Sequence, residues 1–118
     1  VVRVTQAFDC GAIINPHHLE HQVMGCIVQG LGGALFEAVE FANGKILNSS
    51  LSAYRVPRFS DIPKIDIELI DRKDQSPTGA GEAPIIGIAP AIRNAIVDAT
   101  GKGLNTLPML PNGLLAKI

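Results

Sequence analysis

One carboxylate in the sequence lies in a setting that suits proton transfer. Glu82 follows the glycines Gly79 and Gly81 and precedes Pro84, a spacing that predicts a tight loop with the acid held at a fixed place. Apolar residues follow it, and surroundings that exclude water make a carboxylate a better proton acceptor. The residues alone leave two interpretations open: a general base, or a solvated glutamate that stabilises the N-terminus of a following helix.

Three histidines and a glutamate gather where a long helix is expected to begin: His17, His18, Glu20 and His21. His17 and His21 are one helical turn apart, a spacing that would allow both side chains to bind one zinc ion. Their order does not match the His-Glu-x-x-His motif of metalloproteases. A partly exposed first turn without a metal is therefore the favoured interpretation.

The two cysteines, Cys10 and Cys26, have no metal-binding spacing. Buried free thiols are favoured over a disulfide between them. Cysteine usage therefore leaves the cellular compartment open.

Four glycines interrupt the amphipathic helix that apolar spacing predicts from about residue 17 to residue 41: Gly25, Gly30, Gly32 and Gly33. Each interior glycine costs roughly 0.5–1 kcal/mol relative to alanine, so something must compensate. Close packing of another element across a flat surface is favoured. The alternative is the close approach of a bulky ligand or a partner domain.

The remaining patterns predict an α+β fold, with helices on one face of a small mixed sheet, in a single domain over residues 1–118. The strands are expected at residues 1–8, 46–56 and 64–70, with strict alternation in the last. A tight turn is expected at Asn43-Gly44, and a second helix at residues 90–100, closed by Gly101. The tail, residues 104–118, is expected to be irregular with a short helical turn.

Composition excludes several classes of function. The 118 residues are 47% hydrophobic and 18% charged, enough to bury a core. The chain has ten Lys and Arg and eleven Asp and Glu, which give a net charge of −1. There is thus no excess of positive charge to attract nucleic acid or an anionic membrane. No apolar run approaches the roughly 20 residues of a membrane span, and no signal peptide is visible. Because the first residue is Val1 rather than methionine, we expect a segment of a longer polypeptide.

Five segments, in order along the chain, resemble the molybdopterin-binding subunit of the molybdenum hydroxylases, the xanthine dehydrogenase and aldehyde oxidase superfamily. They are the Asp-x-Gly-x-x-x-Asn-Pro turn at residues 9–16, the glycine- and glutamine-containing helix at 21–32, the Tyr-Arg-x-Pro strand end at 48–57, the Gly-x-Gly-Glu loop at 79–82 and the closing helix at 89–96. The resemblance covers about residues 4 to 110 and identifies the chain with the C-terminal segment of that subunit. It is greatest for the branch similar to the isoquinoline 1-oxidoreductase beta subunit.

The resemblance implies a molybdenum–molybdopterin cofactor, in its dinucleotide form, and hydroxylation of an N-heterocycle or aldehyde with oxygen from water. It implies that Glu82 is the catalytic base, which deprotonates a hydroxyl on molybdenum. It also implies that Gln22 hydrogen-bonds near the cofactor, that the backbone at Gly81 passes close to the metal, and that the chain supplies no metal ligand. The implied partners are the remainder of the molybdopterin-binding subunit and an iron–sulfur subunit or domain that carries the clusters.

The sequence departs from the family pattern at the start of the helix, where His21 replaces the usual glycine, and at Gly103 and Asn105, where the related branch often has basic residues. The family's remaining cofactor contacts are expected upstream of Val1. We therefore expect the segment to be inactive alone and to self-associate through uncovered apolar surface. Its location is left open: cytoplasmic, or periplasmic if the parent chain carries a twin-arginine signal.

Two other functions remain as hypotheses. A non-catalytic binding or assembly module would dock a partner through the glycine-rich helix. A small zinc protein built on the histidine turn is the weaker of the two.

Overall fold

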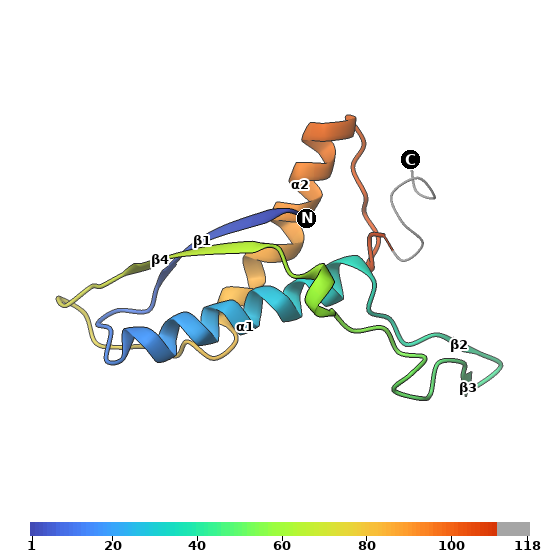
Figure 1. The fold of residues 1–118 in the computed structure, drawn as a ribbon, viewed down its shortest axis with the longest axis horizontal. Coiled ribbons are helices and arrows are strands. Elements are labelled where there is room, and N and C mark those ends of the chain that lie inside the picture. The colour runs from blue at the N-terminus through green and yellow to red at the C-terminus, as the bar shows by residue number, and fades with distance from the viewer. Residues whose placement is uncertain (111–118) are drawn as a thin grey trace.

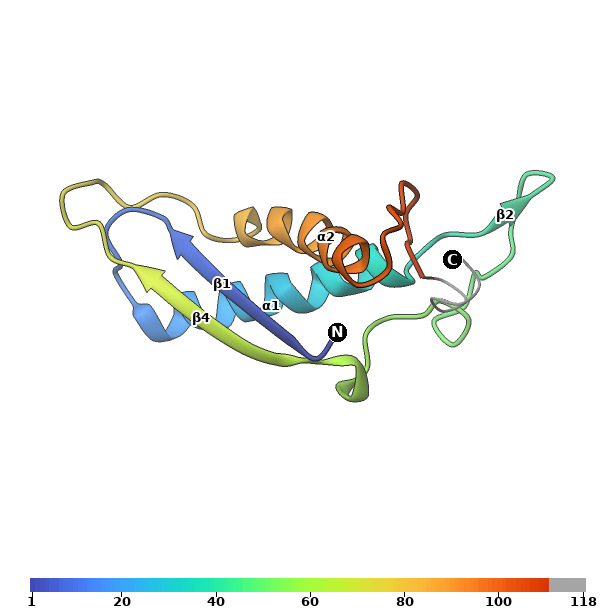
Figure 2. The ribbon, with the colours of Figure 1, turned by 90° about the horizontal axis from the view of Figure 1, so that it is seen from above.

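Two parallel strands lie against a long helix, and a second helix crosses it, in the computed structural model, which describes residues 1–110 (Figures 1 and 2). The strands are β1 (Arg3–Asp9) and β4 (Lys64–Ile70), and the helices are α1 (Pro16–Leu35) and α2 (Ile88–Thr100). The predicted α+β class is confirmed. The part of the tail prediction that falls on residues 111–118 lies outside the described residues.

The two long strands pair in parallel, with Arg3 opposite Lys64 and Asp9 opposite Ile70. Along β4, the alternating side chains of Ile65, Ile67 and Leu69 pack against the core, as the sequence predicted. Because the strands are parallel, both end at the edge of the sheet where α1 begins (Figure 2). The loops that follow the strands are therefore brought together.

The core is centred on α1. Its buried residues Val23, Ile27 and Leu31 contact Ile88 and Ile92 of α2, together with Ala34 and Met109. Burial of a large aliphatic side chain contributes about 1.5–3 kcal/mol, so this cluster offsets the cost of the helix glycines.

The start of α1 matches the sequence prediction. The Asn15 side chain accepts a hydrogen bond from the backbone N–H of His18 at 3.0 Å, and Pro16 occupies the first turn, where it needs no hydrogen-bond partner. The turn before the helix thus sets its first residue.

The predicted end of α1 near residue 41 is wrong, because the helix ends at Leu35. The backbone N–H groups of Phe36 and Glu37 both donate to the carbonyl of Gly32, which breaks the regular pattern. The carbonyls of Ala34 and Leu35 instead accept hydrogen bonds from Met109 and Leu110, at 2.7 and 2.9 Å. Contacts with residues far along the chain therefore decide where the helix stops.

The segment after α1 projects from the body as an arm (Figure 1). It contains the short antiparallel pair β2 (Phe41–Ala42) and β3 (Lys45–Ile46), joined by Asn43 and Gly44 at positive φ, so the predicted tight turn is confirmed. Parallel and antiparallel pairing thus occur in two separate two-stranded sheets rather than in one mixed sheet.

The extended stretch predicted for residues 46–56 is wrong beyond Ile46. The backbone N–H groups of Ala53 and Tyr54 both donate to the carbonyl of Ser50, at 3.0 Å each, and fold the chain into a turn. A short 3-10 helix, η1 (Phe59–Asp61), follows before β4.

The second helix agrees with its prediction at the C-terminal end. It begins at Ile88, two residues earlier than expected, and ends at Thr100, with Gly101 in the left-handed conformation at φ 71. Glycine adopts this conformation without a Cβ penalty, which is why it ends helices so often.

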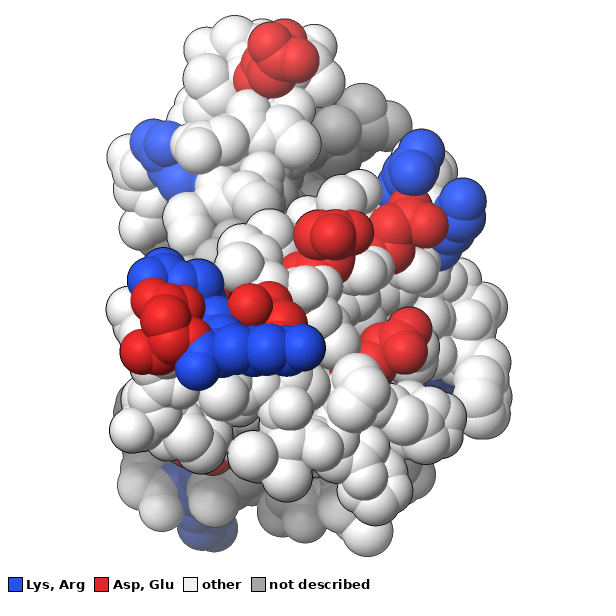
Figure 3. Space-filling model, turned by 90° about the vertical axis from the view of Figure 1, so that its left-hand side faces the viewer, with Lys and Arg blue, Asp and Glu red and all other residues white. Residues whose placement is uncertain are grey.

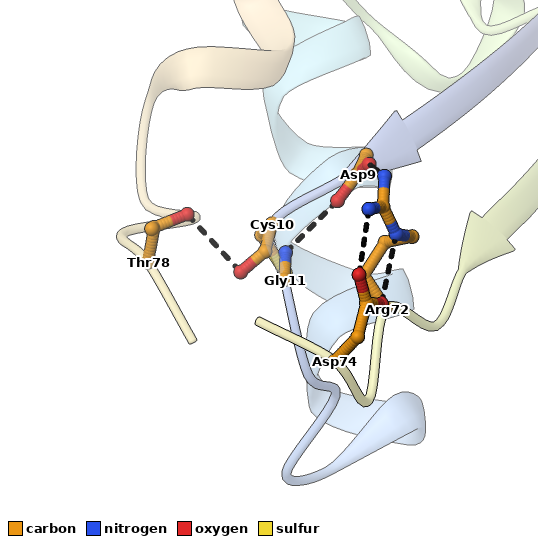
Figure 4. A network of polar contacts seen from close by, with 6 residues as sticks. All are labelled: Asp9, Cys10, Gly11, Arg72, Asp74 and Thr78. Carbon is orange, nitrogen blue, oxygen red and sulfur yellow. Dashed lines mark hydrogen bonds and ion pairs between the residues drawn. The ribbon is translucent and has the colours of Figure 1, made fainter. Parts of the chain in front are cut away.

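The loops after β1 and β4 are tied to each other by a polar network (Figure 4). The carbonyl of Cys10 accepts hydrogen bonds from the Thr78 backbone at 2.7 Å and from the Thr78 hydroxyl at 3.1 Å. The Arg72 guanidinium pairs with Asp74 at 2.8 Å and with Asp9 at 3.8 Å. This network fixes the start of the segment that leads to Glu82.

Gly11 is required at the centre of this junction. Its φ is 81, and a Cβ at this position would overlap the carbonyl oxygen of Ser76. A side chain here would push the two loops apart.

The surface carries both signs of charge. On the side shown in Figure 3, Lys and Arg side chains lie beside Asp and Glu side chains. Arg3, for example, pairs with Asp66 at 2.6 Å on the outer face of the sheet. Within residues 1–110, no helix is both long and apolar enough to span a membrane.

The segment between α1 and β4 exposes large apolar side chains, among them Phe41 (76% exposed), Leu51 (96%) and Phe59 (95%). Uncovered apolar surface favours association in water. We therefore expect the 118-residue chain alone to form dimers or larger assemblies in sedimentation velocity measurements, and the Phe41→Ser/Phe59→Ser pair to shift it toward monomer. A monomer at high concentration for the unmodified chain would contradict this expectation.

Candidate functional site

The three residues that the family resemblance points to lie around one open hollow. Gln22 on α1 and Gly81 and Glu82 on the loop before α2 line a space of about 740 Å³. His21, the departure from the family pattern, lines the same space, as does Gly25. Residues about 60 positions apart in the sequence are thus brought together by the packing of the loop on α1.

Glu82 lies immediately before a 3-10 helix, η2 (Ala83–Gly87). The tight loop predicted around Glu82, between Gly79 and Pro84, is confirmed as far as Glu82, but Ala83 and Pro84 belong to η2. The reason is local: the Ile85 backbone donates to the Glu82 carbonyl at 3.0 Å, and Pro84 fits the first turn of a helix.

The Glu82 carboxylate is exposed and does not cap η2. No other side chain within residues 1–110 hydrogen-bonds to it or forms an ion pair with it. The water-excluding surroundings expected from the sequence are not formed by the described residues, because the neighbouring Ile86 is itself 79% exposed. The backbone therefore places the acid at the hollow, and its carboxylate is free to act on a molecule that enters.

The helix glycines divide between the two interpretations that the sequence left open. A Cβ on Gly30 would lie 2.8 Å from the Cβ of Ile88, and one on Gly32 would overlap the Glu37 carboxylate. These two glycines allow close packing. A Cβ on Gly25 would meet nothing within 4 Å, and Gly25 lines the hollow, so it leaves a side-chain-free wall there.

Two contacts that sequence reasoning missed hold the Glu82 loop. The Cys26 thiol donates to the Gly81 carbonyl at 3.1 Å, and the Gln6 side-chain amide donates to the Pro84 carbonyl at 2.7 Å. Gln6 carried a signal, since it is the polar residue in the inward row of β1. Cys26 carried none.

Both cysteines are free and buried, as predicted. Burial raises the pKa of the Cys26 thiol above its ordinary value, and the negative charge of Glu82 raises this pKa further. A hydrogen bond with the backbone of Ile85 acts in the opposite direction. The thiol is therefore protonated at neutral pH and able to donate.

The histidine turn lies at the exposed start of α1. The rings of His17 and His21 are tilted against each other, with centroids 4.3 Å apart. In the part of the chain that the structure describes, no group of three or more His, Cys, Asp or Glu side chains could hold a metal ion. The geometry therefore gives the zinc hypothesis no support.

Comparison with known proteins identifies the family. Residues 1–63, more than half of the chain, match the molybdopterin cofactor-binding domain. The chain belongs to this family.

Individual relatives agree with this assignment. The chain is 39% identical to the putative xanthine dehydrogenase molybdenum-binding subunit of Escherichia coli (strain K12), over 95% of this chain and 16% of the relative. It is also 39% identical to isoquinoline 1-oxidoreductase subunit beta of Brevundimonas diminuta, over 94% of this chain and 14% of the relative. The chain thus spans about one sixth of the length of these relatives.

A solved structure shares the fold over nearly the whole chain. Quinoline 2-oxidoreductase from Pseudomonas putida 86 superimposes with a TM-score of 0.82 at 27% identity, over 97% of this chain and 16% of that one. The relatives are molybdenum-dependent oxidoreductases of aldehydes and N-heterocycles, and several are named as subunits of larger enzymes. The resemblance read from the sequence is therefore confirmed at the level of the family.

The proximity of Glu82 and Cys26 can be tested by titration. Glu82→Gln removes the negative charge, so the pKa of Cys26 should fall toward its ordinary value but stay above it, because burial remains. The thiolate absorbance of the 118-residue chain, with Cys10→Ala to leave one thiol, measures the midpoint. Glu68→Gln, on the outer face of the sheet, should leave the midpoint unchanged. A midpoint that does not fall in the Glu82 variant would contradict the placement.

Proposed function

We propose that this chain supplies the general base of a molybdenum-dependent hydroxylase, and that Glu82 is that base. The observation that carries the proposal is the meeting of Glu82 with Gln22 and Gly81 around one hollow. A free carboxylate on an anchored loop is what general-base catalysis needs, since position matters as much as proton affinity.

The residues around the hollow fit a bulky cofactor. Neither Gly25 nor Gly81 has any atom within 4 Å of its Cβ position, so a planar group can lie against the backbone there. The Gln22 side chain is exposed at the same wall and offers both an amide donor and a carbonyl acceptor. Gln22 and the backbone at Gly81 are therefore the residues that we assign to the molybdenum–molybdopterin cofactor, in its dinucleotide form.

When bound, that cofactor supplies the two-electron oxidation and the oxygen atom, which derives from water. Glu82 accepts a proton at a carboxylate oxygen as the new carbon–oxygen bond forms. Because the carboxylate has no partner among the described residues, it is available for this proton without breaking an internal contact. The substrate class is an N-heterocycle or an aldehyde, and iron–sulfur clusters on another domain or subunit take up the electrons.

One glutamate and one glutamine cannot hold such a cofactor alone. We therefore propose that the remainder of the molybdopterin-binding subunit completes the site and that the 118-residue chain is inactive by itself. The alternative of a docking module is less favoured, because two of the helix glycines are already covered by Ile88 and by Glu37 and Pro57 of this chain.

In the full-length enzyme, Glu82→Gln should preserve the fold and the molybdenum content, because glutamine has the same size. It cannot take the proton, and loss of a positioned general base costs about 10²–10⁴-fold in rate. We expect the upper end of this range or beyond in turnover of an N-heterocycle or aldehyde per molybdenum. Glu68→Gln is the matched control and should turn over normally. Near-normal turnover of Glu82→Gln with full molybdenum would refute the role of Glu82.

Gln22→Ala should act on the cofactor rather than on the chemistry. Loss of the amide removes hydrogen bonds to the cofactor, so we expect lower molybdenum content or an altered metal spectrum, with a smaller change in turnover per molybdenum. Gln75→Ala, in the loop after β4 and outside the hollow, is the control. Full molybdenum content together with an unchanged spectrum would remove Gln22 from the cofactor site.

A further inference from the structure

Two side chains from different elements hold the backbone on either side of Glu82. The sulfur of Cys26, on α1, lies 3.1 Å from the carbonyl oxygen of Gly81. The amide nitrogen of Gln6, on β1, lies 2.7 Å from the carbonyl oxygen of Pro84. Gly81 precedes the acid directly and Pro84 follows it by two residues. The short stretch that carries Glu82 is thus anchored to the helix at one end and to the strand at the other.

Gln6 lies in a row of β1 that otherwise packs on the core. Val4 and Phe8, two residues away on either side, contact the apolar cluster. The carbonyl of Pro84 can only accept, so the amide nitrogen of Gln6 must face it. This leaves the Gln6 carbonyl oxygen buried without a hydrogen-bond partner among the described residues, which is unfavourable. The bond to Pro84 is what glutamine provides here and an apolar side chain of similar size would not.

Cys26 lies on the other side of the loop and is 2% exposed. Only a protonated thiol can donate to a carbonyl. Burial and the charge of Glu82 hold the pKa of Cys26 above its ordinary value, so the donor persists at neutral pH. Alanine at this position would fill most of the same space and leave the Gly81 carbonyl without its partner.

We propose that Gln6 and Cys26 are positioning residues for Glu82, which hold the backbone from which its side chain projects into the hollow. The proposal rests on the assignment of Glu82 as the base. The carboxylate has no side-chain partner within residues 1–110, so the backbone that these two residues hold is what places it at the hollow. A small misplacement of a reacting group lowers the rate steeply, by up to about 10²-fold for roughly 1 Å.

The test uses Gln6→Leu, Cys26→Ala and Cys26→Ser in the full-length enzyme. Gln6→Leu and Cys26→Ala should each lower kcat about tenfold, while KM changes less than about twofold and molybdenum content is kept. Amide hydrogen exchange in the peptide of residues 79–87 should become faster in both. Cys26→Ser retains a hydroxyl donor and should recover most of the loss. Cys10→Ala removes the other buried thiol, which does not contact the Glu82 loop by a side-chain hydrogen bond within residues 1–110, and should change neither kcat nor the exchange of this peptide.

The same substitutions in a Glu82→Gln background separate positioning from general damage. With no base left to misplace, Gln6→Leu and Cys26→Ala should cause little further loss of turnover. Full additivity in this background would overturn the proposal, because it would mean that the variants act elsewhere.

The outcomes also separate this proposal from that of the base. If Glu82→Gln keeps its activity while the two variants speed exchange of residues 79–87, the base assignment fails and the anchoring of the loop stands. If Glu82→Gln is inactive but Gln6→Leu and Cys26→Ala match the unmodified enzyme in both kcat and exchange, the base assignment stands and the positioning role is refuted.

Discussion

The close contact between Gly30 on α1 and Ile88 at the start of α2 is the constraint on which the site depends. A Cβ on Gly30 would lie 2.8 Å from that of Ile88, so any larger residue would push the two helices apart. Because η2 runs directly into α2, such a shift would carry the segment with Glu82 away from Gln22. The glycine's cost to helix stability is offset by the core that the approach creates, in which Ile88 is 4% exposed. Gly30 thus makes α1 locally less stable but allows the close approach of α2 that shapes the hollow.

Elements governed by local rules could be predicted, and those ended by distant contacts could not. The alternation of residues 64–70 fixed which face of β4 is buried, and Gly101 marked the end of α2. The end of α1 depends instead on Met109 and Leu110, which bond to its last carbonyls from about 75 residues away. Ala38 continued the helical period in the sequence, but the chain has already left the helix at that residue. Periodicity reports which residues would fit a helix, not where tertiary contacts end it.

In the candidate site, too, the residues that belong to local motifs could be predicted, and those that act through distant contacts could not. Glu82, Gln22 and Gly81 could be placed by resemblance, because they belong to short motifs whose order along the chain matches a known family, and the structure brings all three to one hollow. Gln6 and Cys26 could not be placed, because each acts on a backbone carbonyl more than 50 residues away. No motif records such a contact. A glutamine in the inward row of β1 was a visible anomaly, since a buried polar group requires a partner, but the partner could not be named without the fold.

Under the proposed function, one source sets the position of Glu82 and another excludes water from its carboxylate. This chain supplies position, through two anchored carbonyls and a wall kept free of side chains by Gly25. It does not enclose the acid, since Glu82 is exposed in an open hollow. Under the proposed function, the cofactor and the substrate would displace this water when they enter the hollow. Removal of water strengthens a carboxylate as a proton acceptor, so Glu82 would gain its full basicity only when the site is filled. A base whose backbone is anchored beforehand and whose carboxylate loses water last would take its proton in the loaded complex, where the proton transfer leads to product.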